Sequence, residues 1–336
     1  VPRPDMVTVN HDFRVADVME VVILNGYSRI PVLGEGIDDV IGLVYAKDLM
    51  RAERDGREDE PVANFARPAR AVPETKPVAE LLREMQADQF HMAVVIDEYG
   101  ATAGLVTLEA LLEELAGATV DLMKKVLPAV QAVAPDAIYV LVTNPVDVVT
   151  YASLKITDLP PDRIFGSGTV LDASRLRWLV SEACEVAVGN VHAYMAGEHG
   201  DTEVPLWSSA AIGGVPLTSW EQQTGRLGPA RRDEIAHQVV NAAYEVIAGK
   251  GATNYAVGLA VARIVESIRR DENRVLPIST LLQDWHGITD VCMSVPTLVN
   301  ARGAGQRLEV PLDDGELARL TASADAIRAS ARNLGF

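Results

Sequence analysis

The segment Ile138–Asp147 has the sequence Ile-Tyr-Val-Leu-Val-Thr-Asn-Pro-Val-Asp, and it decides the fold of the larger part of the chain. It opens with an uninterrupted apolar run, which is typical of a parallel strand buried on both faces. Polar Asn144 follows, and ligands of open α/β sheets sit beyond the carboxyl ends of the strands. The segment therefore predicts an α/β fold with Asn144 where a cofactor or substrate is held, although Asn-Pro alone is also an ordinary turn signal.

The sequence on either side predicts further elements of the same sheet. Upstream, a helix over 118–133 is indicated by apolar positions at helical spacing, which we expect to pack on the sheet: Leu122, Met123, Val126, Leu127, Val130 and Val133. Downstream, a strand over 164–168 leads into a helix. Residues three apart share a helix face, whereas residues two apart point to nearly opposite sides. Asp172 and Arg175 are therefore predicted to face one site and Arg177 another.

Two glycine-containing loops complete the candidate site. An alternating strand over 191–196 leads into Gly197-Glu-His-Gly-Asp201, where flanking glycines let the His199 side chain reach into a cleft. The stretch Gly251-Ala-Thr-Asn-Tyr255 interrupts a long helical region and offers the hydroxyl of Thr253. Each polar residue taken singly is also compatible with a satisfied group inside the core, but their joint occurrence favours a site.

From Gly117 to Phe336 the chain resembles the family of L-lactate and malate dehydrogenases. The resemblance rests on four motifs, which are Asn144-Pro-Val-Asp147, Leu171-Asp-Ala-Ser-Arg-Leu-Arg177, Gly197-Glu-His-Gly-Asp201 and Gly251-Ala-Thr-Asn-Tyr255. The sequences of Ile212–Leu217 and of Val291–Pro296 are similar to those of the lactate branch in actinobacteria.

This resemblance implies hydride transfer between the nicotinamide of NAD and a small 2-oxo or 2-hydroxy acid, pyruvate or L-lactate. In the family, a residue matching His199 exchanges the proton, one matching Asp172 orients it, and one matching Arg175 holds the substrate carboxylate with two parallel hydrogen bonds. The implied substrate contacts are Asn144, Arg175 and Thr253. The implied cofactor contacts are Thr143, Asn144 and Ser167, and no metal ion is expected.

Arg177 and His192 match a second site of the family. In bacterial lactate dehydrogenases that are activated by fructose 1,6-bisphosphate, matching Arg and His residues from two subunits hold the phosphates of this effector. The resemblance thus implies that the segment descends from an allosteric homo-oligomer, a tetramer. The alternative is an ordinary salt bridge at a subunit interface.

Residues 1–115 contain an internal repeat, with copies at about 1–60 and 61–115. Matching positions are Val9 and Val72, Val15 and Val78, and Gly42 and Gly104. Each copy is predicted to hold a short strand, an amphipathic helix, two strands joined by a turn and a short closing helix, a βαββα unit. Neither copy has much core alone, so we expect the two to bury their sheet faces against each other.

The repeat resembles a CBS-domain pair, with wording near that of the magnesium and cobalt efflux or haemolysin-related branch. The likeness rests on Pro2–Val7, Tyr27–Val32, Asp97–Gly100 and Gly104–Thr107. Such pairs bind adenine nucleotides, ATP or AMP, and an acidic residue after the last strand typically takes the ribose hydroxyls. Asp48 fits that place in the first copy and Ala110 takes it in the second, so we expect one nucleotide at most. The alternative is a structural or dimerising module that binds nothing.

The glycine-rich fingerprint of the dehydrogenase family, which seats a pyrophosphate at a helix N-terminus, does not occur in residues 1–115. The join at Leu111–Val120 carries wording of both families and looks like a splice. We therefore predict a mixed α/β and α+β chain. Its parts are a CBS-domain pair (1–115), a truncated Rossmann-type sheet that is a remnant of the NAD-binding domain (116–168) and a dehydrogenase substrate domain (169–336).

Three interpretations remain open. The first is a recombined dehydrogenase that keeps its substrate-side residues and has little or no NAD-dependent turnover. The second is a working L-lactate dehydrogenase whose cofactor site is completed by a partner chain or an unusual packing. The third is a nucleotide-sensing regulatory protein in which the dehydrogenase remnant is an oligomerising scaffold.

Composition restricts the classes of protein further. A net charge of −17 and a pI near 4.8 argue against general nucleic-acid binding, which needs clustered Lys and Arg. Two cysteines far apart in apolar settings suit buried thiols in a reducing compartment, so we expect a cytoplasmic protein. No apolar run approaches the roughly 20 residues that a membrane helix needs.

Overall fold

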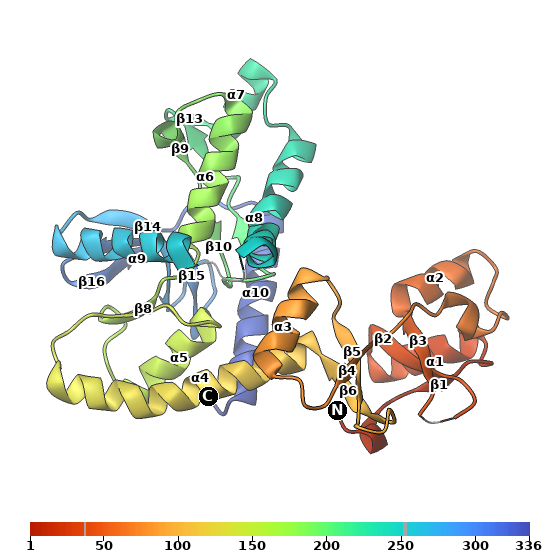
Figure 1. Ribbon diagram of the computed structural model, residues 1–336. Coiled ribbons are helices and arrows are strands. Elements are labelled where there is room, and N and C mark those ends of the chain that lie inside the picture. The colour runs from red at the N-terminus through yellow and green to blue at the C-terminus, as the bar shows by residue number, and fades with distance from the viewer. Residues whose placement is uncertain (37, 251–253) are drawn as a thin grey trace. The chain divides into compact units, whose positions relative to one another are not determined.

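The computed structural model describes residues 1–36, 38–250 and 254–336 and divides the chain into two compact units (Figure 1). Unit 1 is Val1–Leu112 and unit 2 is Glu113–Phe336. Both units mix helices and strands, so the predicted combination of α/β and α+β classes is confirmed.

Unit 1 holds two similar sets of elements, each around a three-stranded sheet. The first set is η1 (Arg3–Asp5), β1 (Val9–Asn10), α1 (Val15–Asn25), β2 (Arg29–Leu33), β3 (Val40–Tyr45), α2 (Ala46–Arg54) and η2 (Val62–Phe65). The second set is β4 (Arg70–Pro73), α3 (Val78–Ala87), β5 (Met92–Ile96), β6 (Thr102–Thr107) and the start of α4 (Leu108–Val133). In each sheet the first strand is parallel to the second, and the second and third form an antiparallel hairpin. The predicted βαββα repeat is therefore present twice.

The two repeats do not share one core, contrary to the expectation from sequence. Buried side chains of the first repeat form one cluster around Val15 and Leu49, and those of the second form a separate cluster around Met85. The helices of each repeat cover their own sheet, so each copy buries its apolar face by itself. The start of the chain joins the second repeat, where the Val1 amine donates to the Leu105 carbonyl at 2.8 Å.

Helix α4 is far longer than the short closing helix predicted for the second repeat. It runs for 26 residues and includes the predicted helix over 118–133. Val120 and Leu127 are buried in the core of unit 2, as expected for a helix that packs on a sheet. Four positions that were predicted to be core are instead exposed, because the sheet of unit 2 ends before it reaches that face of the helix: Leu122, Val126, Val130 and Val133.

The main sheet of unit 2 has five strands in the order β16-β15-β14-β8-β7. Their bounds are β7 (Tyr139–Leu141), β8 (Ile164–Gly166), β14 (Arg274–Leu282), β15 (Val291–Asn300) and β16 (Gly303–Arg307). Only β7 and β8 are parallel, and β7 lies at the edge of the sheet. The predicted truncated Rossmann-type sheet is thus observed, with an edge strand shorter than the predicted run over 138–143.

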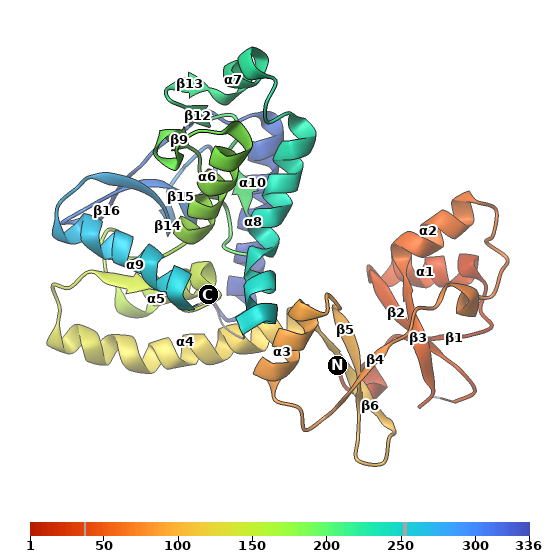
Figure 2. The ribbon, with the colours of Figure 1, turned by 45° about the horizontal axis from the view of Figure 1, so that its top comes forward.

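Helices cover both faces of this sheet (Figures 1 and 2). On one face lie α5 (Val146–Thr157) and α10 (Asp314–Asn333), and on the other lie α6 (Val170–Cys184) and α9 (Asn254–Arg269). The alternation of side chains along β7 matches this arrangement, since Tyr139 and Leu141 join the first core while Ile138 and Val140 pack on the second. Both faces of β7 are therefore apolar, as the uninterrupted run requires.

Shorter elements connect the sheet to the candidate site. They are η3 (Val188–Asn190), β9 (Val191–His192), β10 (Met195–Ala196), β11 (Val204–Pro205), β12 (Ala211–Ile212), β13 (Val215–Pro216), α7 (Leu217–Thr224) and α8 (Pro229–Lys250). The single strand predicted over 191–196 is wrong, because β9 pairs with β12 and β10 pairs with β11 in a different sheet. The cause is the pairing of Gly197 with Ser294, which holds β10 against β15.

Both cysteines, Cys184 and Cys292, are free and buried, as predicted. Among the helices in the described part of the chain, none has the length and apolar character needed to cross a membrane.

Candidate functional site

Three side chains predicted from the sequence meet in unit 2. Asp172 lies in the first turn of α6, and its carboxylate contacts both of the other two residues. The Nδ1 atom of His199 lies 2.8 Å from Asp172 Oδ2, and Arg175 Nη1 donates to Asp172 Oδ1 at 2.9 Å. The Asp172 side chain is buried, whereas those of His199 and Arg175 are partly exposed. The structure therefore brings together a buried carboxylate and two cationic groups that can reach a ligand.

Two glycines allow this approach. Gly168 has a φ of +54°, and a Cβ there would lie 2.5 Å from the Ser279 amide nitrogen, so only glycine lets the chain turn from β8 into α6 at this point. Gly197 has a φ of +97° and pairs with Ser294 of β15. These two close approaches place the start of α6 and the His199 loop over the same end of the sheet.

The electrostatics of the site favour a protonated imidazole. Burial alone would lower the pKa of His199, but its hydrogen bond with Asp172, and the charges of Asp172 and Asp147, raise that pKa above the ordinary value. Because Nδ1 faces Asp172, the other ring nitrogen, Nε2, is the one that can exchange a proton with a ligand. His199 thus has the environment of an acid and base that works near neutral pH.

Sequence reasoning missed two carboxyl groups beside this histidine. Asp147, in the first turn of α5, is buried and accepts the backbone N–H of His199 at 2.7 Å. Burial raises its pKa to about 6, opposed by Ser279 and by the His199 amide. Glu203 is 9% exposed, and burial together with the charge of Asp172 raises its pKa to about 9. Glu203 is therefore a neutral acid at pH 7, and its Oε2 atom has no hydrogen-bond partner.

Their sequence signals were present but weak. Asp147 closes the quoted motif Asn144–Asp147, and an acidic residue in the first turn of a helix is ordinary at the surface. Glu203 follows the quoted motif Gly197–Asp201 by two residues, where glutamate usually indicates an exposed loop. Neither position reveals its burial without the fold.

The residues predicted to contact cofactor and substrate around β7 and β8 do not contact one another as closely as Asp172, Arg175 and His199 do. Thr143 and Asn144 are exposed just beyond β7, and Ser167 follows β8, where its amide donates to the Leu141 carbonyl at 2.7 Å. They share the carboxyl ends of two neighbouring strands, as predicted. Among the described residues, no hydrogen bond links their side chains with His199, whose amide donates to Asp147 instead. Thr253 lies outside the described residues.

The two residues predicted to hold a bisphosphate have different surroundings. Arg177 is largely buried on α6, and its pKa is lowered by burial and then by the nearby charge of Arg263. His192 is exposed on β9. Arg177 donates to the Ser174 hydroxyl at 3.2 Å rather than to a carboxylate.

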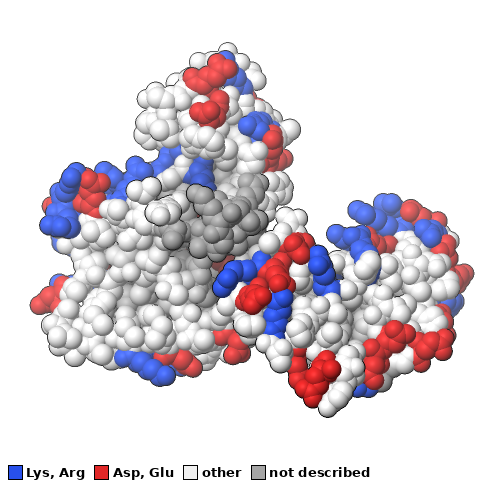
Figure 3. Space-filling model, in the orientation of Figure 1, with Lys and Arg blue, Asp and Glu red and all other residues white. Residues whose placement is uncertain are grey.

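In unit 1, Asp48 lies in the first turn of α2 and its carboxylate already contacts two arginines. Arg67 donates to it at 2.5 Å and Arg51 lies at 3.8 Å. Cationic side chains gather over this helix (Figure 3), and Arg67 also stacks on the Tyr45 ring at 4.8 Å. The carboxylate predicted to take ribose hydroxyls is therefore already paired with arginines of unit 1.

The site formed by Asp172, Arg175 and His199 is poorly suited to binding a metal ion. Ligand atoms of Asp172, His199 and Glu203 lie within 4.8 Å of one another. However, the Arg175 guanidinium is bonded to the same Asp172 carboxylate, and Glu203 is neutral. A cation would compete with a fixed positive charge, so the earlier expectation of no metal stays our prediction.

NAD, which the family implies, fits only in part. Thr143, Asn144 and Ser167, at the ends of β7 and β8, are polar groups that could contact part of such a cofactor. A pyrophosphate cradle needs a strand that runs into a glycine-rich turn and a helix N-terminus. In unit 2 the first element is α4, and no strand of the described residues lies beyond β7 in the sheet. The residues present do not supply that cradle, so we derive no chemical step through NAD.

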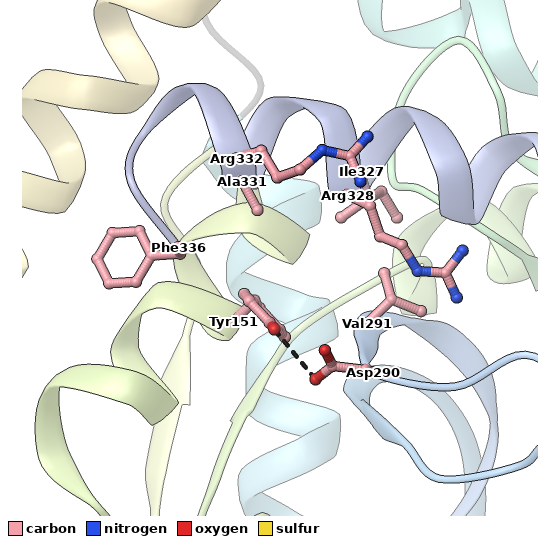
Figure 4. Close-up of a pocket in the computed structure, with 8 residues that line it drawn as sticks. All are labelled: Tyr151, Asp290, Val291, Ile327, Arg328, Ala331, Arg332 and Phe336. Atoms are coloured by element: carbon pink, nitrogen blue, oxygen red, sulfur yellow. Dashed lines mark hydrogen bonds between the residues drawn. The ribbon is translucent and has the colours of Figure 1, made fainter.

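A separate cavity of about 230 Å³ lies between α5 and α10. Figure 4 shows its lining, in which the Tyr151 hydroxyl donates to Asp290 at 3.0 Å. Arg328 and Arg332 also line it, but none of the three predicted catalytic residues does. It is therefore distinct from the candidate site.

Comparisons with known proteins divide the chain near the same place as the two compact units do. The lactate/malate dehydrogenase NAD-binding domain model matches residues 112–166, the α/β C-terminal domain model of the same family matches 169–334, and the CBS domain model matches 1–55 and 62–117. An L-lactate dehydrogenase of Bifidobacterium animalis is 53% identical over 225 residues, which are 66% of this chain and 70% of that protein.

Solved structures give the same result. An L-lactate dehydrogenase from Clostridium thermocellum aligns with a TM-score of 0.61 at 33% identity, over 67% of this chain and 74% of that one. A lactate dehydrogenase from a deep-sea metagenome library aligns with a TM-score of 0.64 at 26% identity, over 98% of this chain and 99% of that one. The chain therefore belongs to the lactate/malate dehydrogenase family and carries a pair of CBS domains ahead of its dehydrogenase part.

Proposed function

We propose that unit 2 retains the substrate-binding and proton-transfer half of an L-lactate dehydrogenase site, specific for a small 2-oxo or 2-hydroxy acid such as pyruvate or L-lactate. We further propose that the chain by itself has little or no NAD-dependent turnover. The single observation that carries this proposal is the contact of Asp172 with both His199 and Arg175, at 2.8 and 2.9 Å.

The roles follow from the chemistry of these groups. The planar guanidinium of Arg175 can donate two parallel hydrogen bonds to a substrate carboxylate, which the ammonium of a lysine cannot reproduce. The protonated His199 can donate from Nε2 to the 2-oxo oxygen and can take the proton back from a 2-hydroxyl. Asp172 orients both groups, and its negative charge favours the imidazolium. Asn144 lies at the strand end where it would contact the substrate oxygen.

Binding of oxamate, an analogue of pyruvate, tests this half of the site without requiring turnover. We expect calorimetry to show binding that weakens as pH rises through the pKa of His199, since the cationic imidazole is the donor. Arg175→Lys should weaken binding by about tenfold or more, because a hydrogen bond to a charged group contributes about 1.5–3 kcal/mol. Arg163→Lys, at an exposed pair with Asp136, is the matched control. Equal affinity of the Arg175 variant and the control would reject the proposal.

Low turnover is tested separately. The missing pyrophosphate cradle is the reason to expect a rate of NADH oxidation with pyruvate far below that of an intact dehydrogenase. A rate close to that of the Bifidobacterium relative would overturn this part of the proposal.

For unit 1 we propose a second activity, the binding of one adenine nucleotide, ATP or AMP, beside Asp48. The supporting observation is the cationic group around Tyr45, formed by Arg29, Lys47 and Arg67 within 5.6 Å of the ring. These cations suit phosphates, and Asp48 suits ribose hydroxyls once Arg67 turns to a phosphate. Titration with ATP and AMP should give one site that Asp48→Asn weakens, and no binding at all would leave a structural module.

We also propose that an oligomer of this chain binds fructose 1,6-bisphosphate through Arg177 and His192. The support is the environment of Arg177, which among the described residues donates to the Ser174 hydroxyl rather than to a carboxylate and lies near the positive charge of Arg263. A phosphate would relieve the repulsion between these arginines. Calorimetry on the assembled oligomer tests this, and Arg177→Gln should abolish the heat of binding.

A further inference from the structure

We infer that unit 2 accepts the first strands of a dehydrogenase cofactor domain from a second polypeptide. The docking surface consists of the open edge of β7 and an apolar stripe on α4, defined as Leu122, Val126, Val130 and Val133. The inference rests on the proposed function for its activity readout alone, since docking itself is measured without catalysis.

The first observation is the hydrogen-bonding state of β7. The Tyr139 amide donates to the Arg163 carbonyl at 2.7 Å, and the Leu141 carbonyl accepts from the Ser167 amide at 2.7 Å. Backbone groups of successive strand residues point to opposite sides, so the N–H and C=O of Val140 point away from β8. No strand of the described residues pairs with that side. The edge therefore offers a donor and an acceptor to an incoming strand.

The second observation is the surface of α4. At 100° per residue the four stripe residues fall on one side of the helix, roughly 100° around from Val120 and Leu127, which are buried. Their exposed fractions are 52, 41, 41 and 83% in chain order. A contiguous apolar stripe of this kind marks an interaction surface. The helix thus has two apolar faces, of which unit 2 covers one.

The occupant is identified by what unit 2 lacks. In a doubly wound fold with strand order 3-2-1-4-5-6, β7 and β8 take the places of strands five and six, so the strand that belongs beside β7 is the fourth, parallel to it. The NAD-binding model matches only residues 112–166, whereas the C-terminal model matches 169–334. The portion of the relatives that this chain does not cover is therefore mostly cofactor domain. That portion also carries the glycine-rich turn that this chain lacks.

A second copy of the chain fits this surface less well. Twofold symmetry would pair β7 with β7 in antiparallel fashion, over three residues only. Such a pair brings no strand parallel to β7 and no pyrophosphate cradle. The cofactor-domain segment supplies both, together with apolar side chains for the α4 stripe.

The test mixes the full chain with the cofactor-domain segment of the Bifidobacterium relative that lies outside the 70% covered by this chain. We expect a one-to-one complex by light scattering, slower hydrogen exchange of the Val140 amide, and a rise in NADH oxidation with pyruvate. Val126→Glu/Val130→Glu should weaken the complex at least about tenfold, because two charges would be buried without partners. Ile23→Glu/Leu24→Glu, at two exposed apolar residues of unit 1, is the matched control and should bind as the wild type does.

The outcomes separate the two proposals. Absence of a complex, or equal binding by both double variants, overturns the docking inference even where oxamate still binds. A complex that protects Val140 but does not restore turnover, in a chain that fails to bind oxamate, supports docking and rejects the proposed function. A chain that is already dimeric through Val126 and Val130, and takes up no segment, identifies a second copy as the occupant and overturns the inference.

Discussion

Glu203 illustrates what a single residue reveals only once it is folded. The three residues predicted to carry the chemistry are close together, because motifs on α6 and on the His199 loop converge at one end of the sheet. Glu203 follows the second motif but was not predicted, since its burial comes from the packing of β11 and not from local pattern. Asp147 was likewise missed as a partner of His199, because its contact is to a backbone amide 52 residues away.

The neutral state of Glu203 predicts a stability that depends on pH. Its folded pKa of about 9 exceeds the ordinary value of 4.5, so its contribution to stability is fully present below pH 4.5 and is lost as pH rises toward 9. Glu203→Gln keeps the shape of the neutral acid without this loss. The stability falls by about 1.4 kcal/mol for each pH unit above 4.5, so at pH 8 we expect the variant to be more stable by several kcal/mol, on the order of 5, and nearly equal to the wild type near pH 5.

Denaturant titration followed by tryptophan fluorescence measures this difference in unit 2, which contains all four tryptophans of the chain: Trp178, Trp207, Trp220 and Trp285. The exposed Glu182→Gln is the control and should leave the pH dependence unchanged. An Glu203→Gln curve parallel to the wild type across this pH range would show that Glu203 is ionised in the folded protein.

At the scale of elements, local sequence patterns predicted the structure best where the contacts of an element lie close to it in the sequence. The repeats of unit 1 and the turn from β8 into α6 follow from spacing and glycines. The α4 stripe was predicted to be core because helical periodicity identifies apolar faces but not what covers them. The strand over 191–196 divides in two for a similar reason, since the pairing of Gly197 with Ser294 is a long-range contact.

The N-terminus of α10 gives a prediction at this scale. The Asp313 carboxylate accepts a hydrogen bond from the Glu316 amide at 2.7 Å, and the Glu316 carboxylate accepts one from the Asp313 amide. These two bonds form a capping box at the start of a helix that packs on α5 and β15. Asp313→Ala should cost unit 2 about 1 kcal/mol of unfolding free energy, measured by denaturant titration.

The pH dependence of that loss checks its cause. The Glu316 amide lowers the pKa of Asp313, so the cap is fully present above the ordinary aspartate range and is lost as pH falls through the lowered value. The variant and wild type should therefore converge at acid pH. Asp314→Ala, one residue along, should cost less at neutral pH, and an equal cost at both positions would contradict the capping role.

At the scale of the whole molecule, the chain joins two units that differ in how completely their sheets and helices are covered. Each buried cluster of unit 1 draws on one repeat, and the repeats satisfy their own sheets. Unit 2 matches the dehydrogenase family, and among the described residues β7 has a free edge and one face of α4 is exposed. The resemblance of each part was evident from its motifs, whereas the consequence of joining them depends on backbone edges and exposed faces that motifs do not describe.

The division of the chain into two compact units predicts two unfolding transitions. Met85 is 1% exposed in the second repeat, and truncation of such a side chain costs about 2–5 kcal/mol. Met85→Ala should therefore lower the transition of unit 1, followed by far-ultraviolet circular dichroism, and leave the tryptophan transition of unit 2 unchanged. ATP or AMP, if bound at Asp48, should raise the first transition alone. A single coincident transition that shifts with Met85→Ala in both signals would show instead that α4 couples the two units into one cooperative structure.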